Sequence, residues 1–211
     1  VNSCFADINI PSIHNYIGGL VGELKSGSVI SNSNSTGTIT GNDDVGGLVG
    51  NSNGSQINNS FSSANISSDK QNVGGFIGMN YQSTIAESYS LGSVTLTGQA
   101  STKSGGFVGY NNLGTISLCY SLGAVSSEDS EVGGFVGYND GTIEKSYAYV
   151  NTIGRGTVGG FVGENISSGT ISNCYSRGSA TATGNGHVYL GGFVDHHQEK
   201  NHHSLNLRYK W

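Results

Sequence analysis

Apolar residues recur along this chain in one pattern that repeats about every 28 residues. Each copy opens with two glycines and an apolar pair, and successive glycine pairs lie 26 to 32 residues apart. The pairs begin at Gly18, Gly46, Gly74, Gly105, Gly133, Gly159 and Gly191. One unit of that length cannot bury its own apolar face, whereas stacked copies bury it together. The pattern predicts an all-β fold, a parallel β-solenoid (β-helix) of about seven turns with a ~28-residue repeat.

A second segment of each copy alternates small or aliphatic residues with larger or polar ones. Ser60, Ser62, Ala64 and Ile66 share one parity, and the residues between them share the other. Because strand side chains alternate between two faces, the first set should point into a narrow interior. The matching inward sets at the ends are Cys4, Ala6, Ile8 and Ile10 in the first copy, and Cys174, Ser176, Gly178 and Ala180 in the last.

The copy between residues 133 and 150 also contains a polar turn. Asn139, Asp140 and Gly141 are residues that tolerate left-handed backbone, so they predict a corner. The glycines that flank Phe135-Val136 predict close backbone approach or bulges at other corners.

The outward parity carries an aromatic residue in most copies. These residues are Phe5, Phe61, Tyr89, Tyr120, Tyr147 and Tyr175, and the second copy has Asn34 instead. Stacked aromatics stabilise adjacent strands, so the column has a purely structural interpretation. Aromatic side chains are also favoured at recognition surfaces. The candidate binding strip is therefore formed by Phe61, Tyr89, Tyr120, Tyr147 and Tyr175.

Composition restricts the partners that we expect. Charged residues make up 11% of the chain and the formal net charge is −5, without a basic stripe, which argues against a nucleic-acid partner. No stretch approaches the roughly 18 consecutive apolar residues of a membrane span. The chain begins inside a repeat, so we expect it to be part of a longer polypeptide.

The last residues depart from the pattern. Asp195 stands where a glycine is expected, and residues 196–211 contain no glycine. We therefore separate residues 1–194, the repeat solenoid, from residues 195–211, an atypical His-rich C-terminal tail. A shifted reading frame, a truncated gene or a true cap would each produce this tail.

Few residues suggest metal or catalytic chemistry. The weak metal candidates are His196, His197, His202 and His203, but no His-Glu-x-x-His signature accompanies them. Acidic residues precede several glycine pairs, at Asp43-Asp44, Asp69 and Glu128-Asp129-Glu131, where they would be solvated loop charges or calcium ligands. No nucleophile has an evident base. We predict no cofactor, no organised metal site and no enzymatic activity.

The three cysteines fall at the same position of their copies. Cys119 and Cys174 would lie about two rungs apart, roughly 9–10 Å, which is beyond the reach of a disulfide. We predict that Cys4, Cys119 and Cys174 are buried free thiols that act as small apolar residues.

The recurring Gly-Gly-Leu-Val-Gly and Gly-Gly-Phe-Val-Gly elements are followed by Asn, Gly-x-Ile, Ser-Tyr-Ser and Gly-x-Val. These elements resemble the GLUG-motif repeat, best in residues 105–125, 133–150 and 159–178, and the resemblance covers nearly everything from Cys4 to Val194. GLUG repeats occur in large secreted or surface-anchored bacterial proteins, including adhesin-like proteins and the non-catalytic part of metalloproteases that cleave immunoglobulin A. The resemblance implies an extracellular or cell-surface location and a spacer or binding role. It carries over no catalytic residue.

The preferred function is a non-enzymatic extracellular repeat module, a rigid stalk or adhesive surface that binds a glycan or a host surface protein. One alternative is an enzyme fragment, either the non-catalytic repeat region of a secreted protease or a polysaccharide-cleaving β-helix. The weaker alternative is an ice-binding solenoid, which needs a regular threonine array. Thr36, Thr38 and Thr40 form one run and Thr95 and Thr97 another, but the matching positions include Ser63, Asn65, Tyr149 and Arg177.

Overall fold

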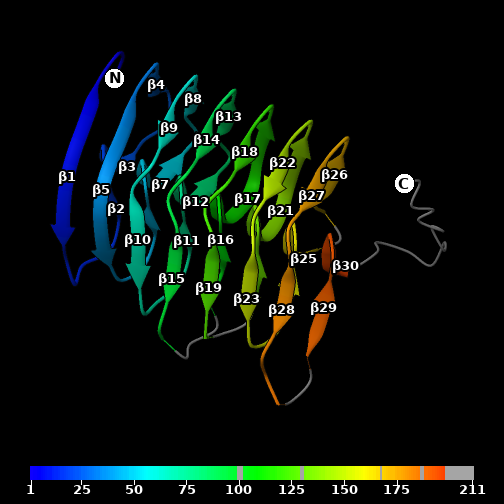
Figure 1. Cartoon of the computed structure of the whole chain (residues 1–211). Coiled ribbons are helices and arrows are strands. Elements are labelled where there is room, and N and C mark those ends of the chain that lie inside the picture. The colour runs from blue at the N-terminus through cyan, green and yellow to red at the C-terminus, as the bar shows by residue number, and fades with distance from the viewer. Residues whose placement is uncertain (99–101, 129–130, 167, 186–187, 198–211) are drawn as a thin grey trace.

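The chain winds into a stack of parallel turns. The computed structural model describes residues 1–98, 102–128, 131–166, 168–185 and 188–197, and these residues form short strands and no helix. Paired residues lie 26 to 32 positions apart in the sequence, and every strand pairing is parallel. Successive turns stack side by side in Figure 1, making about six full turns between the first and last glycine pairs. The predicted parallel β-solenoid is confirmed.

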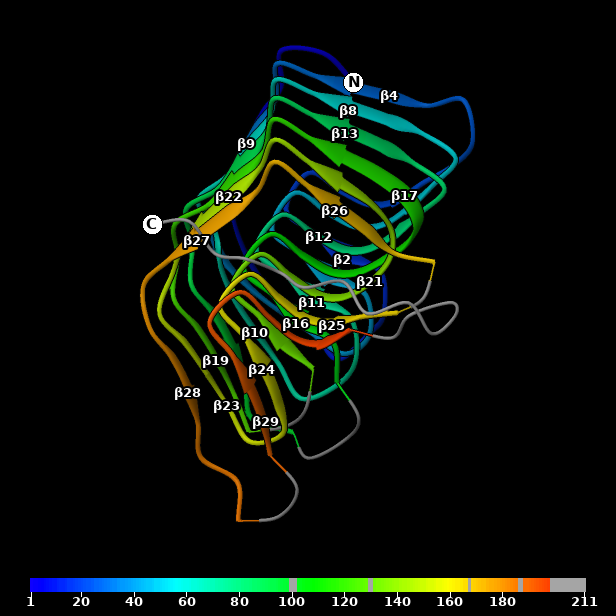
Figure 2. The ribbon, with the colours of Figure 1, turned by 90° about the vertical axis from the view of Figure 1, so that its right-hand side faces the viewer.

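The described strands form three sheets, and Figure 2, which looks along the stack, shows that each turn visits all three. The front sheet faces the viewer in Figure 1 and contains β1 (Phe5–Pro11), β5 (Asn34–Gly41), β9 (Phe61–Ser62), β10 (Asn65–Ser68), β14 (Tyr89–Ser90), β15 (Val94–Leu96), β18 (Tyr120–Ser121), β19 (Val125–Ser127), β22 (Tyr147–Tyr149), β23 (Thr152–Gly154), β27 (Tyr175–Arg177) and β28 (Ala180–Ala182). The glycine sheet contains β2 (Ile17–Gly18), β6 (Val45–Gly46), β11 (Val73–Gly74), β16 (Ser104–Gly105), β20 (Val132–Gly133), β24 (Thr157–Gly159) and β29 (Tyr189–Gly191). The bent sheet contains β3 (Val21–Leu24), β4 (Val29–Ser31), β7 (Val49–Asn53), β8 (Gln56–Asn58), β12 (Ile77–Tyr81), β13 (Thr84–Ala86), β17 (Val108–Ser117), β21 (Val136–Glu144), β25 (Val162–Asn165), β26 (Thr170–Ser172) and β30 (Val194–His197).

The glycine pairs allow the turns to approach closely, as the sequence predicts. A Cβ on Gly106 would collide with the carbonyl of Gly134 in the next turn, so the second glycine of the pair is needed for space. The residue after each pair begins the core, and from the third pair onward it is a phenylalanine. Phe76, Phe107, Phe135 and Phe161 are fully buried, with ring centroids 4.7–4.9 Å apart and nearly parallel planes.

The bent sheet adds a second apolar column to the core. It consists of Ile30, Ile57, Ile85, Ile116 and Ile143, all fully buried, and each isoleucine pairs in register with its copy in the next turn. Like side chains of equal volume pack above one another without gaps, which gives the interior its density.

The predicted polar turn is a bend, but its asparagine points inward. Asn80, Asn111, Asn139 and Asn165 form a buried ladder in which each side-chain amide donates to the carbonyl oxygen of the next, at 2.8, 2.8 and 2.7 Å. In earlier turns, the residues with left-handed backbone at this bend include Gly54, Gln82 and Leu113. The prediction that Asn139 supplies the left-handed corner is therefore wrong, because its amide pairs with its own copies inside the solenoid.

The inward parity of the front sheet is confirmed in the middle turns and modified at the ends. Ser60, Ser62, Ala64 and Ile66 are buried. In the first copy Cys4 and Ile8 are exposed while Ala6 and Ile10 are half-buried, and in the last copy Cys174, Ser176 and Ala180 are half-buried while Gly178 is exposed. The difference arises because each of these strands is covered by a described neighbouring turn on one side only.

Strand β30 contains the first three residues of the segment that the sequence separates as a tail. Its backbone pairs with β25, with Val194 opposite Val162 and His197 opposite Asn165. Residues 198–211 lie outside the described residues.

We predict that Gly106→Ala destabilises the solenoid by about 3 kcal/mol or more, because its Cβ would push two turns apart. Gly192→Ala is the matched control, since Gly192 occupies the same position of the last turn and has no atom within 4 Å of its Cβ site. Thermal unfolding followed by circular dichroism measures both variants. Equal losses of stability would show that space between turns is not the reason for the glycine.

We predict that Asn111→Ala costs about 2–4 kcal/mol, because it leaves the amides of Asn80 and Asn139 without their partner. Asn112→Ala removes the adjacent, outward and half-buried amide and should change stability by about 0.5 kcal/mol or less. Denaturant titration of the two variants compares them. A similar loss for both would contradict a stabilising role for the ladder.

Candidate functional site

The five aromatic residues of the predicted strip lie in one column on the outside of the front sheet. We call Phe61, Tyr89, Tyr120, Tyr147 and Tyr175 the aromatic column. Neighbouring rings are 4.7–5.0 Å apart between centroids, with interplanar angles of 2–6°. Asn34 lies between this column and Phe5, as the sequence indicates.

Face-to-face stacking decides what the aromatic column can offer to a ligand. Each ring face within the column is covered by the next ring, so the ring edges and hydroxyl groups point to solvent. Tyr89, Tyr120 and Tyr147 are half-buried, whereas Tyr175 at the end of the stack is 57% exposed. Within the described residues, no hydrogen bond joins these tyrosine hydroxyls to another residue. The column therefore presents a row of free hydroxyl groups at the spacing of the strands.

The electrostatics of the stacked tyrosines follow from their burial. Burial raises the pKa of Tyr120, and the neighbouring hydroxyls of Tyr89 and Tyr147 raise it further. Burial likewise raises the pKa of Tyr147, with a smaller contribution from Tyr175. Both shifts favour the neutral hydroxyl of Tyr120 and Tyr147, which suits hydrogen bonding to an uncharged partner.

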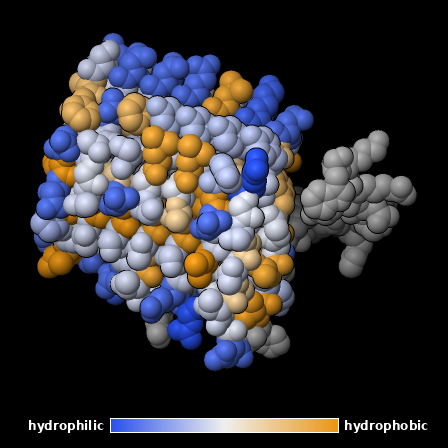
Figure 3. Space-filling model, viewed as in Figure 1, coloured by the Kyte–Doolittle hydropathy of each residue, from blue (hydrophilic) through white to orange (hydrophobic). Residues whose placement is uncertain are grey.

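Neighbouring columns extend this surface beyond the residues that the sequence singled out. Leu91, Leu122 and Tyr149 lie two residues after the aromatic column and are 40%, 42% and 55% exposed. The sequence signal for them is the outward parity of the same strands. Figure 3, viewed toward the front sheet, shows apolar groups in the middle of this face and hydrophilic groups along its upper and lower margins.

Two shallow grooves cross the same face. One, of about 480 Å³, is lined by Thr38, Ile39, Thr40, Asn65, Ile66, Ser67, Ser93 and Thr95. The other, of about 400 Å³, is lined by Leu122, Ala124, Tyr149, Val150 and Asn151. The first groove extends over three successive turns and the second over two.

A second aromatic group, which sequence reasoning missed, lies outside the front sheet. The Lys103 ammonium is 5.3 Å from the ring centroid of Tyr110 and 5.2 Å from that of Tyr138. Burial, together with the nearby carboxylates of Glu164 and Glu131, raises the pKa of Tyr138 to about 12. Because the Lys103 ammonium already lies over both rings, this group attaches the loop that contains Lys103 to the bent sheet.

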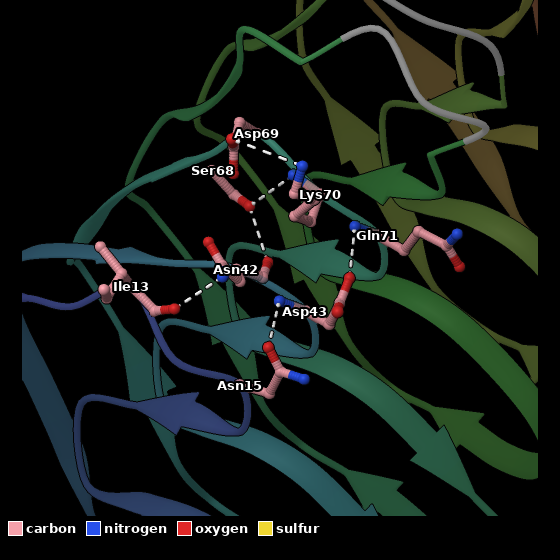
Figure 4. Close-up of polar contacts among 8 residues, drawn as sticks. All are labelled: Ile13, Asn15, Asn42, Asp43, Ser68, Asp69, Lys70 and Gln71. Atoms are coloured by element: carbon pink, nitrogen blue, oxygen red, sulfur yellow. Dashed lines mark hydrogen bonds and ion pairs between the residues drawn. The ribbon is translucent and has the colours of Figure 1, made fainter.

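In the acidic loops, Asp43 joins two neighbouring turns, whereas Asp69 pairs with the next residue in the sequence. The carboxylate of Asp43 accepts from the backbone of Gln71 at 3.1 Å, and Asp69 forms an exposed ion pair with Lys70 at 3.7 Å, as Figure 4 shows. Asn42 donates to the carbonyl of Ile13 at 2.6 Å in the same cluster. Asp129 lies outside the described residues.

Asp44 departs from the prediction of a solvated loop charge. It is only 5% exposed, and its carboxylate accepts hydrogen bonds from Asn51 and Asn72, both at 2.7 Å. Burial raises its pKa, and the two amide donors partly offset that effect. The hydrogen bonds from Asn51 and Asn72 stabilise the Asp44 side chain in its buried position.

The cysteines occupy a serine position rather than an apolar one. In this column Ser60 and Ser88 donate to the carbonyl two residues before them, at 2.8 Å, and the Cys119 thiol lies 3.1 Å from the carbonyl of Ser117 in the same way. Cys119 is buried, which raises its pKa to about 12, and the three thiols are free. The predicted burial is wrong for Cys4, which is exposed, and only partly right for Cys174.

No group of three or more His, Cys, Asp or Glu side chains that could hold a metal occurs among the described residues. The described part of His196 and His197 is their backbone in β30. His202 and His203 lie outside the described residues.

Comparison with protein families matches residues 13–40 to the GLUG motif. The chain carries a GLUG motif. The matched segment starts just before β2 and ends inside β5, so one motif corresponds to one turn of the solenoid. The predicted resemblance is confirmed. No curated protein and no solved structure matches the chain, and none of the described segments is a helix that could span a membrane.

We predict that alkaline pH weakens the fold through the stacked tyrosines. The folded pKa values of Tyr120 and Tyr147 are raised, so their contribution to stability is fully present below the unfolded pKa of about 10 and is lost as the pH rises through the folded pKa values. Ultraviolet absorbance of tyrosinate, followed together with circular dichroism, measures this. Tyr147→Phe should make the loss above about pH 10 shallower. If the pH dependence of stability is unchanged in Tyr147→Phe, the loss of stability at alkaline pH does not arise from the stacked tyrosines.

Proposed function

We propose that this chain is a non-enzymatic repeat module that presents the front sheet as an adhesive surface for a glycan or a host protein, in an extracellular or cell-surface setting. The occurrence of GLUG repeats in secreted and surface-anchored proteins supports the setting. The fold supports the mechanical part of the proposal, because a continuous ladder of backbone hydrogen bonds and one core make a stiff rod.

The observation that carries the proposal is the chemistry of the front sheet across five turns. Residues 34–40, 61–67, 89–95, 120–126 and 147–153 contain aromatic, aliphatic, hydroxyl and amide side chains. A surface of this composition can bind through many weak contacts, whereas catalysis needs a few groups with matched proton affinities. Binding therefore fits the surface better than chemistry does.

The test is a glycan and matrix-protein array probed with the full chain and two variants. The first variant changes Tyr89, Tyr120, Tyr147 and Tyr175 to serine, and the second changes the same four residues to phenylalanine. The phenylalanine variant keeps the ring stack and removes only the hydroxyl groups, so it separates recognition from folding.

We expect a ligand of the wild-type chain to bind both variants more weakly by about tenfold or more, since each lost hydrogen bond contributes about 1 kcal/mol. Circular dichroism confirms that the phenylalanine variant is folded. A ligand that binds this variant as tightly as the wild type would exclude the tyrosine hydroxyls from the binding site. If no component of the array binds the chain, only a spacer role would remain.

A further inference from the structure

The outward side of the front sheet forms one continuous surface in the five middle turns. We call it the central face, and it has four columns of side chains that are exposed or half-buried. The first column is Asn34, Phe61, Tyr89, Tyr120 and Tyr147; the second is Thr36, Ser63, Leu91, Leu122 and Tyr149; the third is Thr38, Asn65, Ser93, Ala124 and Asn151; the fourth is Thr40, Ser67, Thr95, Ser126 and Ile153.

The central face carries no charged residue. Stacking by itself does not impose this, because the bent sheet accommodates Asp140, Glu144 and Glu164 at half-buried positions of its strands. Charged side chains flank the face at its two ends, where Asp7 pairs with Thr36 and the Arg177 guanidinium lies 5.1 Å from the centroid of the Tyr149 ring. A charged polymer would find no counter-charge along the central face between these ends, and the net charge of −5 opposes a polyanion. The chemistry therefore selects an uncharged ligand.

The face places apolar side chains between hydrogen-bonding groups. Leu91 and Leu122 form an exposed aliphatic row beside the tyrosine hydroxyls. On the other side, Asn65 accepts from the backbone of Ser93 at 3.0 Å and Asn151 accepts from that of Ser179 at 3.1 Å, which leaves their amide NH₂ groups to donate outward. Sugar rings have the complementary pattern, with apolar C–H faces and hydroxyl edges.

The direction of a ligand follows from the repeat. In the fourth column, Thr40, Ser67, Thr95 and Ser126 present a hydroxyl group at each strand spacing of about 4.8 Å. In the first column, Tyr89, Tyr120 and Tyr147 do the same, whereas across a strand the chemistry changes from column to column. The groove at Thr38, Asn65 and Thr95 runs over β5, β10 and β15, and thus also follows the stack. A linear polymer meets equivalent groups only when it lies parallel to the solenoid axis.

We propose that the central face binds an uncharged linear polysaccharide that lies parallel to the solenoid axis and spans several turns. This inference rests on the proposed adhesive function and adds to it the class of ligand and its orientation.

The test compares uncharged probes, namely cellulose, chitin and β-1,3-glucan, with the charged probes alginate and heparin, using the full chain. Thr95→Lys places a charge in the central face. Thr84→Lys is its matched control, because Thr84 is an exposed threonine of the same turn on the bent sheet. Both substitutions are at exposed positions, and circular dichroism verifies that the variants fold.

We expect retention by at least one uncharged polysaccharide, with little dependence on salt. Thr95→Lys should weaken this binding by about tenfold or more, because a charge would be desolvated beneath the ligand, and Thr84→Lys should leave it unchanged. For oligosaccharides of the polysaccharide that is retained, the affinity should rise from the disaccharide to the hexasaccharide. Ser67→Lys and Ser126→Lys should each weaken binding of the hexasaccharide as well.

Several results would overturn the inference and leave the adhesive function standing: tyrosine-dependent binding to a charged polysaccharide or only to a protein, equal effects of Thr84→Lys and Thr95→Lys, or affinity independent of chain length. Binding that Thr95→Lys weakens but the fourfold phenylalanine variant does not would support the inference and remove the tyrosine hydroxyls from the proposed site. Failure to bind any probe on either panel would overturn both proposals.

Discussion

The distance between parallel strands governs this molecule. Backbone hydrogen bonds hold each residue above its own copy in the next turn, at about 4.8 Å, so every side chain packs against a side chain of the same position. Each position of the repeat therefore forms a column along the stack, and the residue at that position must pack well against an identical or similar residue. Glycines satisfy this condition by leaving space, and isoleucines by filling it. Phenylalanines satisfy it by stacking, and asparagine amides by donating and accepting hydrogen bonds at once.

The same constraint explains where the polar groups lie. An asparagine amide has a donor and an acceptor, so Asn80, Asn111 and Asn139 can be buried in a line with their bonds completed by one another. A carboxylate has only acceptors, and like charges placed opposite each other repel. Asp44 is buried, and its carboxylate accepts hydrogen bonds from the side-chain amides of Asn51 and Asn72. Asp43, next to it in the same loop, is half-buried, and Asp69 in the loop of the next turn is exposed, so solvent reaches both carboxylates.

The fold could be predicted from the sequence because the period, the glycine pairs and the strand parity all report the column arrangement directly. The predictions that were wrong concern residues whose sequence signal has two meanings. Asn139 before a glycine is typical of a turn, and the same residue is suited to a ladder; recurrence of Asn at the same place in four copies was the signal for the ladder. For the candidate site, parity placed the aromatic residues correctly. It contained no information on ring orientation, which depends on packing between turns.

Ring orientation decides which groups the proposed binding surface would offer to a ligand. Since stacking covers the ring faces of Phe61, Tyr89 and Tyr120, these rings would offer edges and hydroxyls, and the apolar contact would come from Leu91 and Leu122 beside them. The ring of Tyr149 already lies against the Arg177 guanidinium. Each turn then contributes only a few weak contacts to a ligand. A ligand that spans many turns adds these contacts after losing its translational freedom once, so affinity depends on the number of turns in register rather than on any single pocket. The regular strand spacing that stabilises the solenoid is also what allows weak contacts to sum.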